Sequence, residues 1–141
     1  MYLAMTVAKY IVSKCTREKS PISNLQLQKL LYLIQKESLE INDEPIFVDE
    51  IEAWRFGPAV PNVFFYFSGY GAMPIVFEYV VDEIEDDDRE LIDDVVDRKK
   101  MLHPWDYLEE ICGDGGAWCR VWDGGAGDNK VIPVEMIVEF G

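Results

Sequence analysis

The stretch Ile51–Gly71, with the sequence IEAWRFGPAVPNVFFYFSGYG, constrains the fold of this chain more than any other. Gly57 can adopt positive φ, while Pro58 fixes its own φ and disfavours helical backbone for the glycine before it. Pro61 suits the first position of a helix, because that position needs no backbone donor. The stretch therefore predicts an extended segment, a rigid Gly57-Pro58 corner, and a short helix over Pro61–Gly69.

Two longer helices are predicted ahead of this stretch. Apolar residues at steps of three and four give Leu3–Cys15 and Asn24–Leu39 one buried face each. Ser23 and Gln26 have the spacing of a capping box, so the second helix begins there. We expect the two helices to pack as an antiparallel helical hairpin. Three polar side chains of the second helix are expected to face outward: Gln28, Gln35 and Lys36.

The remaining segments are shorter. Ile46–Val48 and Glu52–Phe56 have the length of strands, and Pro74–Val81 is expected to be extended but irregular. Further helices are predicted over Asp86–Arg98, Trp105–Ile111 and Pro133–Phe140, and Gly-rich surface loops over Gly113–Gly116 and Gly124–Gly127. Together, these segments predict a mainly α fold: a compact single domain over residues 1–141, with five to six helices and a small antiparallel β-ribbon.

The charge of the chain limits its partners. Its 27 acidic and 13 basic residues give a formal net charge of −14, which repels phosphate backbones, so we expect no direct nucleic-acid binding. The same charge favours attraction to a basic partner. The acidic run Asp82–Asp97 is either a solvated helix face or the footprint of such a partner. Repulsion between helical neighbours costs only about 0.2–0.5 kcal/mol per pair, which favours the solvated face.

Nothing in the sequence predicts catalysis, a metal or a cofactor. The chain has three cysteines, Cys15, Cys112 and Cys119, an odd number without the spacing of zinc ligands. We therefore expect these cysteines to be small buried hydrophobic residues of a protein in a reducing compartment. His103 is the only histidine, and its neighbours predict a corner between helices and a structural or surface role. No apolar run approaches the ~20 residues that span a bilayer. We therefore expect a cytoplasmic, non-enzymatic protein that does not insert into membranes.

Three ordered motifs resemble the Panacea-domain antitoxins, a family that includes SocA-like and GepA-like phage-associated proteins. The first motif is SPISNLQLQKLLYLIQKE (Ser20–Glu37), and the second is the Ile51–Gly71 stretch. The third is AWCRVW (Ala117–Trp122), followed by IPVEMIVEF (Ile132–Phe140). The resemblance covers nearly the whole chain. It implies an antitoxin from a two-gene toxin–antitoxin pair, carried by phage or prophage, that binds and neutralises a cognate protein toxin.

Six residues of these motifs are candidates for a partner-binding surface: Trp54, Phe56, Gly57, Pro58, Pro61 and Trp118. Tryptophan is a common interface anchor, but it also fills cores. The strand-like alternation around Trp54 and the aromatic residues that follow favour a core position for its ring. The alternative function is that of a phage-encoded acidic interaction or adaptor protein that acts on a host target. The sequence specifies neither the toxin nor the oligomeric state.

Overall fold

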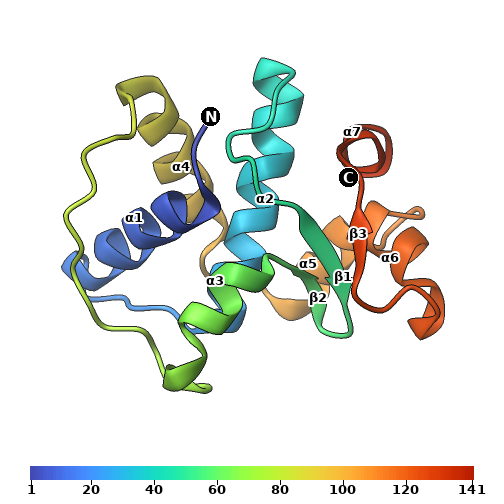
Figure 1. Cartoon of the computed structure of the whole chain (residues 1–141), viewed down its shortest axis with the longest axis horizontal. Helices are drawn as coiled ribbons and strands as arrows, with labels where there is room; N and C mark the ends of the chain where they lie inside the picture. The colour runs from blue at the N-terminus through green and yellow to red at the C-terminus, as the bar shows by residue number, and fades with distance from the viewer.

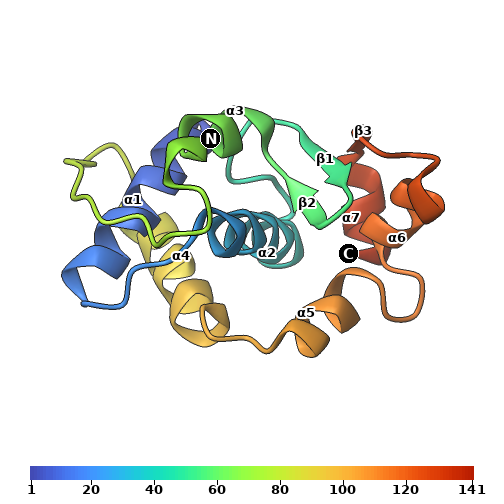
Figure 2. The same ribbon diagram turned by 90° about the horizontal axis from the view of Figure 1, so that it is seen from below.

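Helix α2 (Asn24–Asn42) lies at the centre of the computed structural model, which describes residues 1–141 (Figures 1 and 2). Figure 2 shows α2 nearly end-on, with the other elements around it. The helix begins with the predicted capping box: the Ser23 hydroxyl accepts a hydrogen bond from the Gln26 amide, and the Gln26 side chain accepts one from the Ser23 amide. It ends at Asp43, whose φ of 57° is left-handed.

Helices α1 (Ala4–Arg17) and α4 (Asp86–Lys99) lie on one flank of α2. In both views α1 lies across α2 instead of alongside it, so the predicted antiparallel hairpin is wrong. The physical reason is that α2 shares its surface among several neighbours, and α4 makes the most extensive of these contacts. Ala4 and Ala8 are fully buried, so small residues form part of the inner face of α1.

The sheet has three antiparallel strands in the order β2-β1-β3. Strand β1 (Ile51–Trp54) turns through Arg55 and Phe56 into β2 (Gly57–Ala59), while β3 (Lys130–Ile132) arrives from near the C-terminus. The Gly57-Pro58 step is therefore part of a strand and not the predicted corner. Proline is tolerated there because β2 is an edge strand. Residues 46–48 form no strand; Phe47 makes only an isolated bridge, to Tyr2.

Six further helical segments complete the chain: four α-helices and two 3-10 turns. Helix α3 (Pro61–Tyr66) starts at Pro61 as predicted and continues into a 3-10 turn, η1 (Ser68–Tyr70). Helices α5 (Pro104–Ile111), α6 (Ala117–Trp122) and α7 (Val134–Phe140) follow, with the 3-10 turn η2 (Asp123–Gly125) after α6. The mainly α prediction is confirmed. The count is seven α-helices, because AWCRVW forms a helix of its own. Residues Pro74–Val81 form no helix or strand, in agreement with the irregular segment predicted there, and Ile75 makes only an isolated bridge, to Ile22.

Two glutamines of α2 that were expected to face outward are buried, with Gln28 1% and Gln35 2% exposed. The Gln35 side-chain oxygen accepts a hydrogen bond from the Ile46 amide at 2.9 Å, and its nitrogen donates to the Phe47 carbonyl at 3.1 Å. Tyr2 pairs only with the Ile46 carbonyl and the Val48 amide, so this buried side chain satisfies the remaining polar groups of the segment.

One contiguous cluster of 32 buried apolar residues joins the α1–α2–α4 flank to the sheet and the C-terminal helices. Its members extend from Ala4 on α1 to Ile137 on α7. The cluster holds both ends of the chain against α2. None of the helices has the length and apolar composition required to span a membrane.

Candidate partner-binding surface

Four aromatic rings come together on the surface where the β1–β2 hairpin meets α3. Trp54 ends β1, Phe56 lies in the turn, and Phe64 and Phe65 lie on α3. The ring centroid of Trp54 is 5.1 Å from that of Phe64, 5.6 Å from that of Phe56 and 5.8 Å from that of Phe65. Phe56 and Phe65 are 40% and 63% exposed. These four side chains, here called the aromatic patch, form a contiguous apolar surface.

Trp54 belongs to this patch and is absent from the core, which corrects its predicted core position. Its ring is half-buried, and its indole N–H donates to Glu52 Oε1 at 2.9 Å. Side chains two residues apart on a strand share a face, so Trp54 lies beside Glu52 while Ile51 and Ala53 are buried on the other face. The Glu52-x-Trp54 spacing is a sequence signal for this orientation, because a carboxylate marks the solvent side of a strand.

The sequence candidates did not include Phe64 and Phe65. Val63 and Phe67 are buried and four positions apart, so they define the inner face of α3 and its C-terminal end. Phe64 and Phe65 then lie outside that face. The uninterrupted aromatic run Phe64–Phe67 is a sequence signal for exposed rings, because a helix of fewer than two turns cannot direct every one of its rings inward.

Buried amides of α2 hold the backbone under the patch. The Gln28 side-chain oxygen accepts a hydrogen bond from the Val60 amide at 2.8 Å, just ahead of α3. Asn24 donates to the Phe64 carbonyl at 2.9 Å and accepts from the Gln28 side chain at 3.1 Å. Because these amides are buried and paired, they fix the position of α3 relative to α2.

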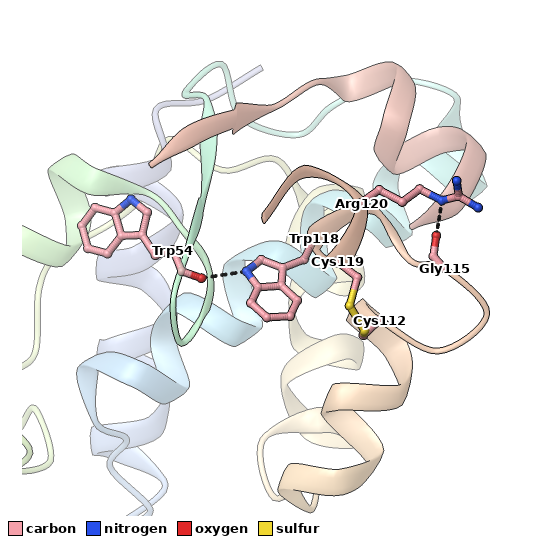
Figure 3. Close-up of a disulfide and its surroundings, with 6 residues drawn as sticks. All are labelled: Trp54, Cys112, Gly115, Trp118, Cys119 and Arg120. Atoms are coloured by element: carbon pink, nitrogen blue, oxygen red, sulfur yellow. Dashed lines mark hydrogen bonds between the residues drawn. A yellow bond between two sulfur atoms is a disulfide. The ribbon is translucent and has the colours of Figure 1, made fainter. Parts of the chain in front are cut away.

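Trp118 is buried beneath the patch. Only 7% of the residue is exposed, and its indole N–H donates to the Trp54 carbonyl at 2.7 Å. Figure 3 shows the two indoles on opposite sides of this carbonyl. Trp118 also stacks on Trp122, with ring centroids 5.1 Å apart. The end of β1 is therefore fixed by a residue 64 positions away in the sequence.

Cys112 and Cys119 form a disulfide that joins the end of α5 to α6, beside Trp118 (Figure 3). This pairing corrects the expectation that both are separate buried hydrophobes; each is half-buried. Only Cys15 is a buried free thiol. The Gly113–Gly116 loop turns within the ring that the disulfide closes, which is how two half-cysteines seven positions apart meet.

Gly57 and Pro58 are buried under the hairpin, and Pro61 is half-buried at the start of α3. Gly57 has the predicted positive φ, at 131°. A Cβ at this position would lie 3.5 Å from the Tyr107 hydroxyl, so backbone conformation and not space requires glycine. Of the six candidates, Trp54 and Phe56 form the surface with Pro61 at its edge, and the others lie beneath it.

A groove of about 320 Å³ runs beside the patch. Phe56 and Phe64 form one wall, and the start of α2 and the turn after η1 form the other. Leu25, 45% exposed, adds an apolar side chain to this second wall. The groove extends the aromatic patch, so the combined surface offers both protruding rings and a depression.

The acidic run lies on α4 and the segment before it, and part of it contacts α1 and the residue Tyr2 ahead of that helix. Tyr2 donates to Asp88 at 2.6 Å, Tyr10 donates to Asp93 at 2.7 Å, and the Lys14 ammonium is 3.2 Å from Asp97.

These contacts shift the pKa of two α1 side chains. Burial and the hydrogen bond to Asp93 raise the pKa of Tyr10 to about 12. Burial lowers the pKa of Lys14, but its hydrogen bonds to Glu18 and Asp97 raise that pKa above its ordinary value overall. Asp88, Asp93 and Asp97 therefore have a structural role, and most other carboxylates of the acidic run face water.

His103 has a structural contact. It is the N-cap of α5, where its Nδ1 accepts a hydrogen bond from the Trp105 amide at 3.2 Å. The structure contains no group of three or more His, Cys, Asp or Glu side chains placed to hold a metal ion.

Comparisons with known proteins agree on one family. The profile of a family described as "Antitoxin SocA-like, Panacea domain" matches residues 27–119, which is more than half of the chain. A similar curated protein is the Antitoxin SocA of Caulobacter vibrioides, 40% identical over 73 residues. That alignment covers 52% of this chain and 39% of the relative, so the match spans less than half of the relative's length. No solved structure matches the chain.

Proposed function

The chain belongs to the SocA-like antitoxin family of Panacea-domain proteins, and we propose that it neutralises a protein toxin by binding it directly through the aromatic patch. The observation that carries this proposal is the exposure of Phe56 and Phe65 within a cluster of contacting rings. Exposed aromatic anchors supply much of the energy of protein interfaces, because they bury a large area with few rotatable bonds.

The support beneath the patch favours tight binding. Gln28, Asn24 and Trp118 fix the backbone of both elements that carry the rings. Because the backbone of the hairpin and α3 is already ordered in the free protein, binding loses little conformational entropy there. The rings are thus preorganised for a partner with a complementary apolar surface.

The net charge adds a preference for the kind of toxin. A chain with a formal net charge of −14 accelerates its encounter with a basic partner and disfavours an acidic one. The proposed partner is therefore a basic protein with an exposed apolar site, encoded beside the antitoxin gene. The antitoxin acts by covering that site, without turnover.

Co-expression tests the proposal. The antitoxin should restore growth to cells that express the neighbouring toxin gene, and the two proteins should co-purify. Phe65→Ala should abolish both effects while leaving the melting temperature near that of the parent, because the ring is mostly exposed. Trp105→Ala is the matched control, since Trp105 on α5 is 73% exposed and outside the patch. Rescue without a physical complex would exclude direct binding. Loss of binding in Trp105→Ala alone would place the contact surface on α5.

A further inference from the structure

A basic pocket opens on the side of α2 away from α3, between α2, the end of α4 and the start of α5. Figure 2 shows the connector from α4 to α5 passing along this side of α2. The pocket has a volume of about 350 Å³ and 11 lining residues. Four of them are basic or imidazole side chains: Lys29, Lys99, Lys100 and His103. None of the 11 lining residues is Asp or Glu, although the chain has 27 acidic and only 13 basic residues.

We propose that this pocket, here called the lysine pocket, binds a small phosphate ester, with the phosphoryl group held by the lysines. An ammonium group acts as a point charge with three donors and is a common ligand of phosphate oxygens. This inference concerns a surface separate from the aromatic patch and does not depend on the toxin proposal.

Lys29 provides the charge that is free for a ligand. It forms no salt bridge, whereas the other two lysines of the pocket do. Its ammonium lies over the Tyr107 ring, 5.0 Å from the centroid. This contact positions the ammonium at the pocket without neutralising it.

The other donors differ in how far they are already engaged. Lys100 is 3.8 Å from Glu18, a long separation for an ion pair, and its side chain is 13% exposed, while Lys99 is closely paired with Glu110. The His103 Nδ1 already accepts a hydrogen bond, so in the neutral imidazole Nε2 carries the proton and can donate. The eight-residue helix α5 begins at the pocket and adds the partial positive charge of its N-terminus.

The apolar part of the pocket determines the class of ester. Leu30, Leu33 and Tyr107 are buried beneath the pocket, and half-buried Leu102 and exposed Met101 provide its accessible apolar lining. Free inorganic phosphate leaves this surface uncovered. A phosphate attached to a flat or apolar body covers it, because the body displaces water from Met101 and Leu102 while the phosphate meets the ammonium groups.

A purely structural role for the lysines makes a different prediction. Lysines at the C-terminal end of a helix complement its dipole, and this accounts for Lys99 and Lys100 at the end of α4. It does not account for Lys29, which lies in the first half of α2 and has the Tyr107 ring but no carboxylate as its partner. If the three lysines have only a structural role, the pocket should bind no ligand.

Titration with phenyl phosphate, followed by calorimetry and by NMR of the backbone amides, tests the proposal. We expect saturable binding, with shifts confined to the amides around Lys29 and Leu102–Tyr107, and weaker binding of inorganic phosphate. Lys29→Gln should weaken binding about tenfold, because it removes one charge-assisted contact. Lys130→Gln, an equal charge change at an exposed residue of β3, should leave it unchanged.

A second variant distinguishes the loss of a phosphate contact from a change in local packing. Lys29→Gln also removes the contact with the Tyr107 ring, so Lys100→Gln, which keeps that contact, should weaken binding in the same direction. Three results would overturn the proposal: no saturation up to about 10 mM phenyl phosphate, equal binding of phenol, or parental affinity in both pocket variants.

Discussion

The aromatic patch and the acidic face of α4 both depart from an ordinary protein surface, but they are organised in opposite ways. In the patch, the rings contact one another and point outward, while buried side chains hold the backbone beneath them. On α4, some carboxylates pair with α1 and the residue Tyr2 before it, others pair with arginines of α4 itself, and Asp87 and Glu90 face water without any partner. The first surface is preorganised, and the second is solvated.

This difference separates two contributions to binding. Desolvating rigid apolar anchors lowers the dissociation rate, whereas exposed charges mainly change how fast partners meet. We therefore expect the patch to supply affinity for the toxin and the acidic face to supply association rate. The four predictions below test this division, in order of decreasing effect.

Trp118→Ala should have the largest effect, because it removes a buried ring and the donor to the Trp54 carbonyl. The free energy of unfolding should fall by about 3–5 kcal/mol, measured by urea denaturation. Trp105→Ala, at an exposed tryptophan, should change it by less than about 0.5 kcal/mol. If both variants unfold like the parent, Trp118 does not support the patch.

The Cys112–Cys119 disulfide should contribute the next largest effect. Replacing both cysteines with serine should lower the free energy of unfolding by about 2–3 kcal/mol, because the short loop is no longer closed in the unfolded chain. The comparison needs an oxidising buffer. In excess reducing agent, parent and variant should unfold alike, and a difference that persists there would assign the effect to side-chain packing.

Trp54→Ala separates binding from stability. The ring is half-buried on the patch, so the free energy of unfolding should fall by less than about 2 kcal/mol, clearly less than for Trp118→Ala. Toxin binding should weaken by about 2 kcal/mol or more. Thermal melts of the variant alone, followed by calorimetry with the toxin, distinguish the two effects. A large loss of stability with unchanged affinity would move Trp54 back into the scaffold.

Neutralising the acidic face should have the smallest effect. The double change Asp87→Asn and Glu90→Gln should alter toxin affinity by less than about 1 kcal/mol, because both side chains are exposed and unpaired. Stopped-flow measurements should show slower association at low salt and no difference at high salt. Asp93→Asn is the contrasting variant, since it weakens the acceptor of Tyr10 and should lower stability instead. A large loss of affinity in the double variant would make the acidic face a contact surface.

Part of the candidate site follows from the sequence. Trp54 and Phe56 were candidates from their motif, and Gly57 was expected to have the positive φ that it shows. Phe64 and Phe65 were missed, because a run of rings does not say which of them a short helix buries. Trp118 is a candidate from its motif, and only the fold shows that its indole turns inward to a carbonyl on another segment.

The sequence by itself determined the features that depend on neighbouring residues. Ser23 and Gln26 set the start of α2, Pro61 set the start of α3, and the strongly acidic composition followed from simple counting. These signals are readable because a cap or a proline acts through backbone groups within one turn of the chain.

Only the tertiary structure decided which distant segments share the site. Strand β3 pairs with β1 across most of the chain, Trp118 reaches the end of β1, and Gln28 turns inward to the Val60 amide. Each of these contacts depends on which polar groups and apolar faces remain unpaired once the other elements surround α2. That competition is settled by packing in three dimensions, which residue spacing alone does not encode.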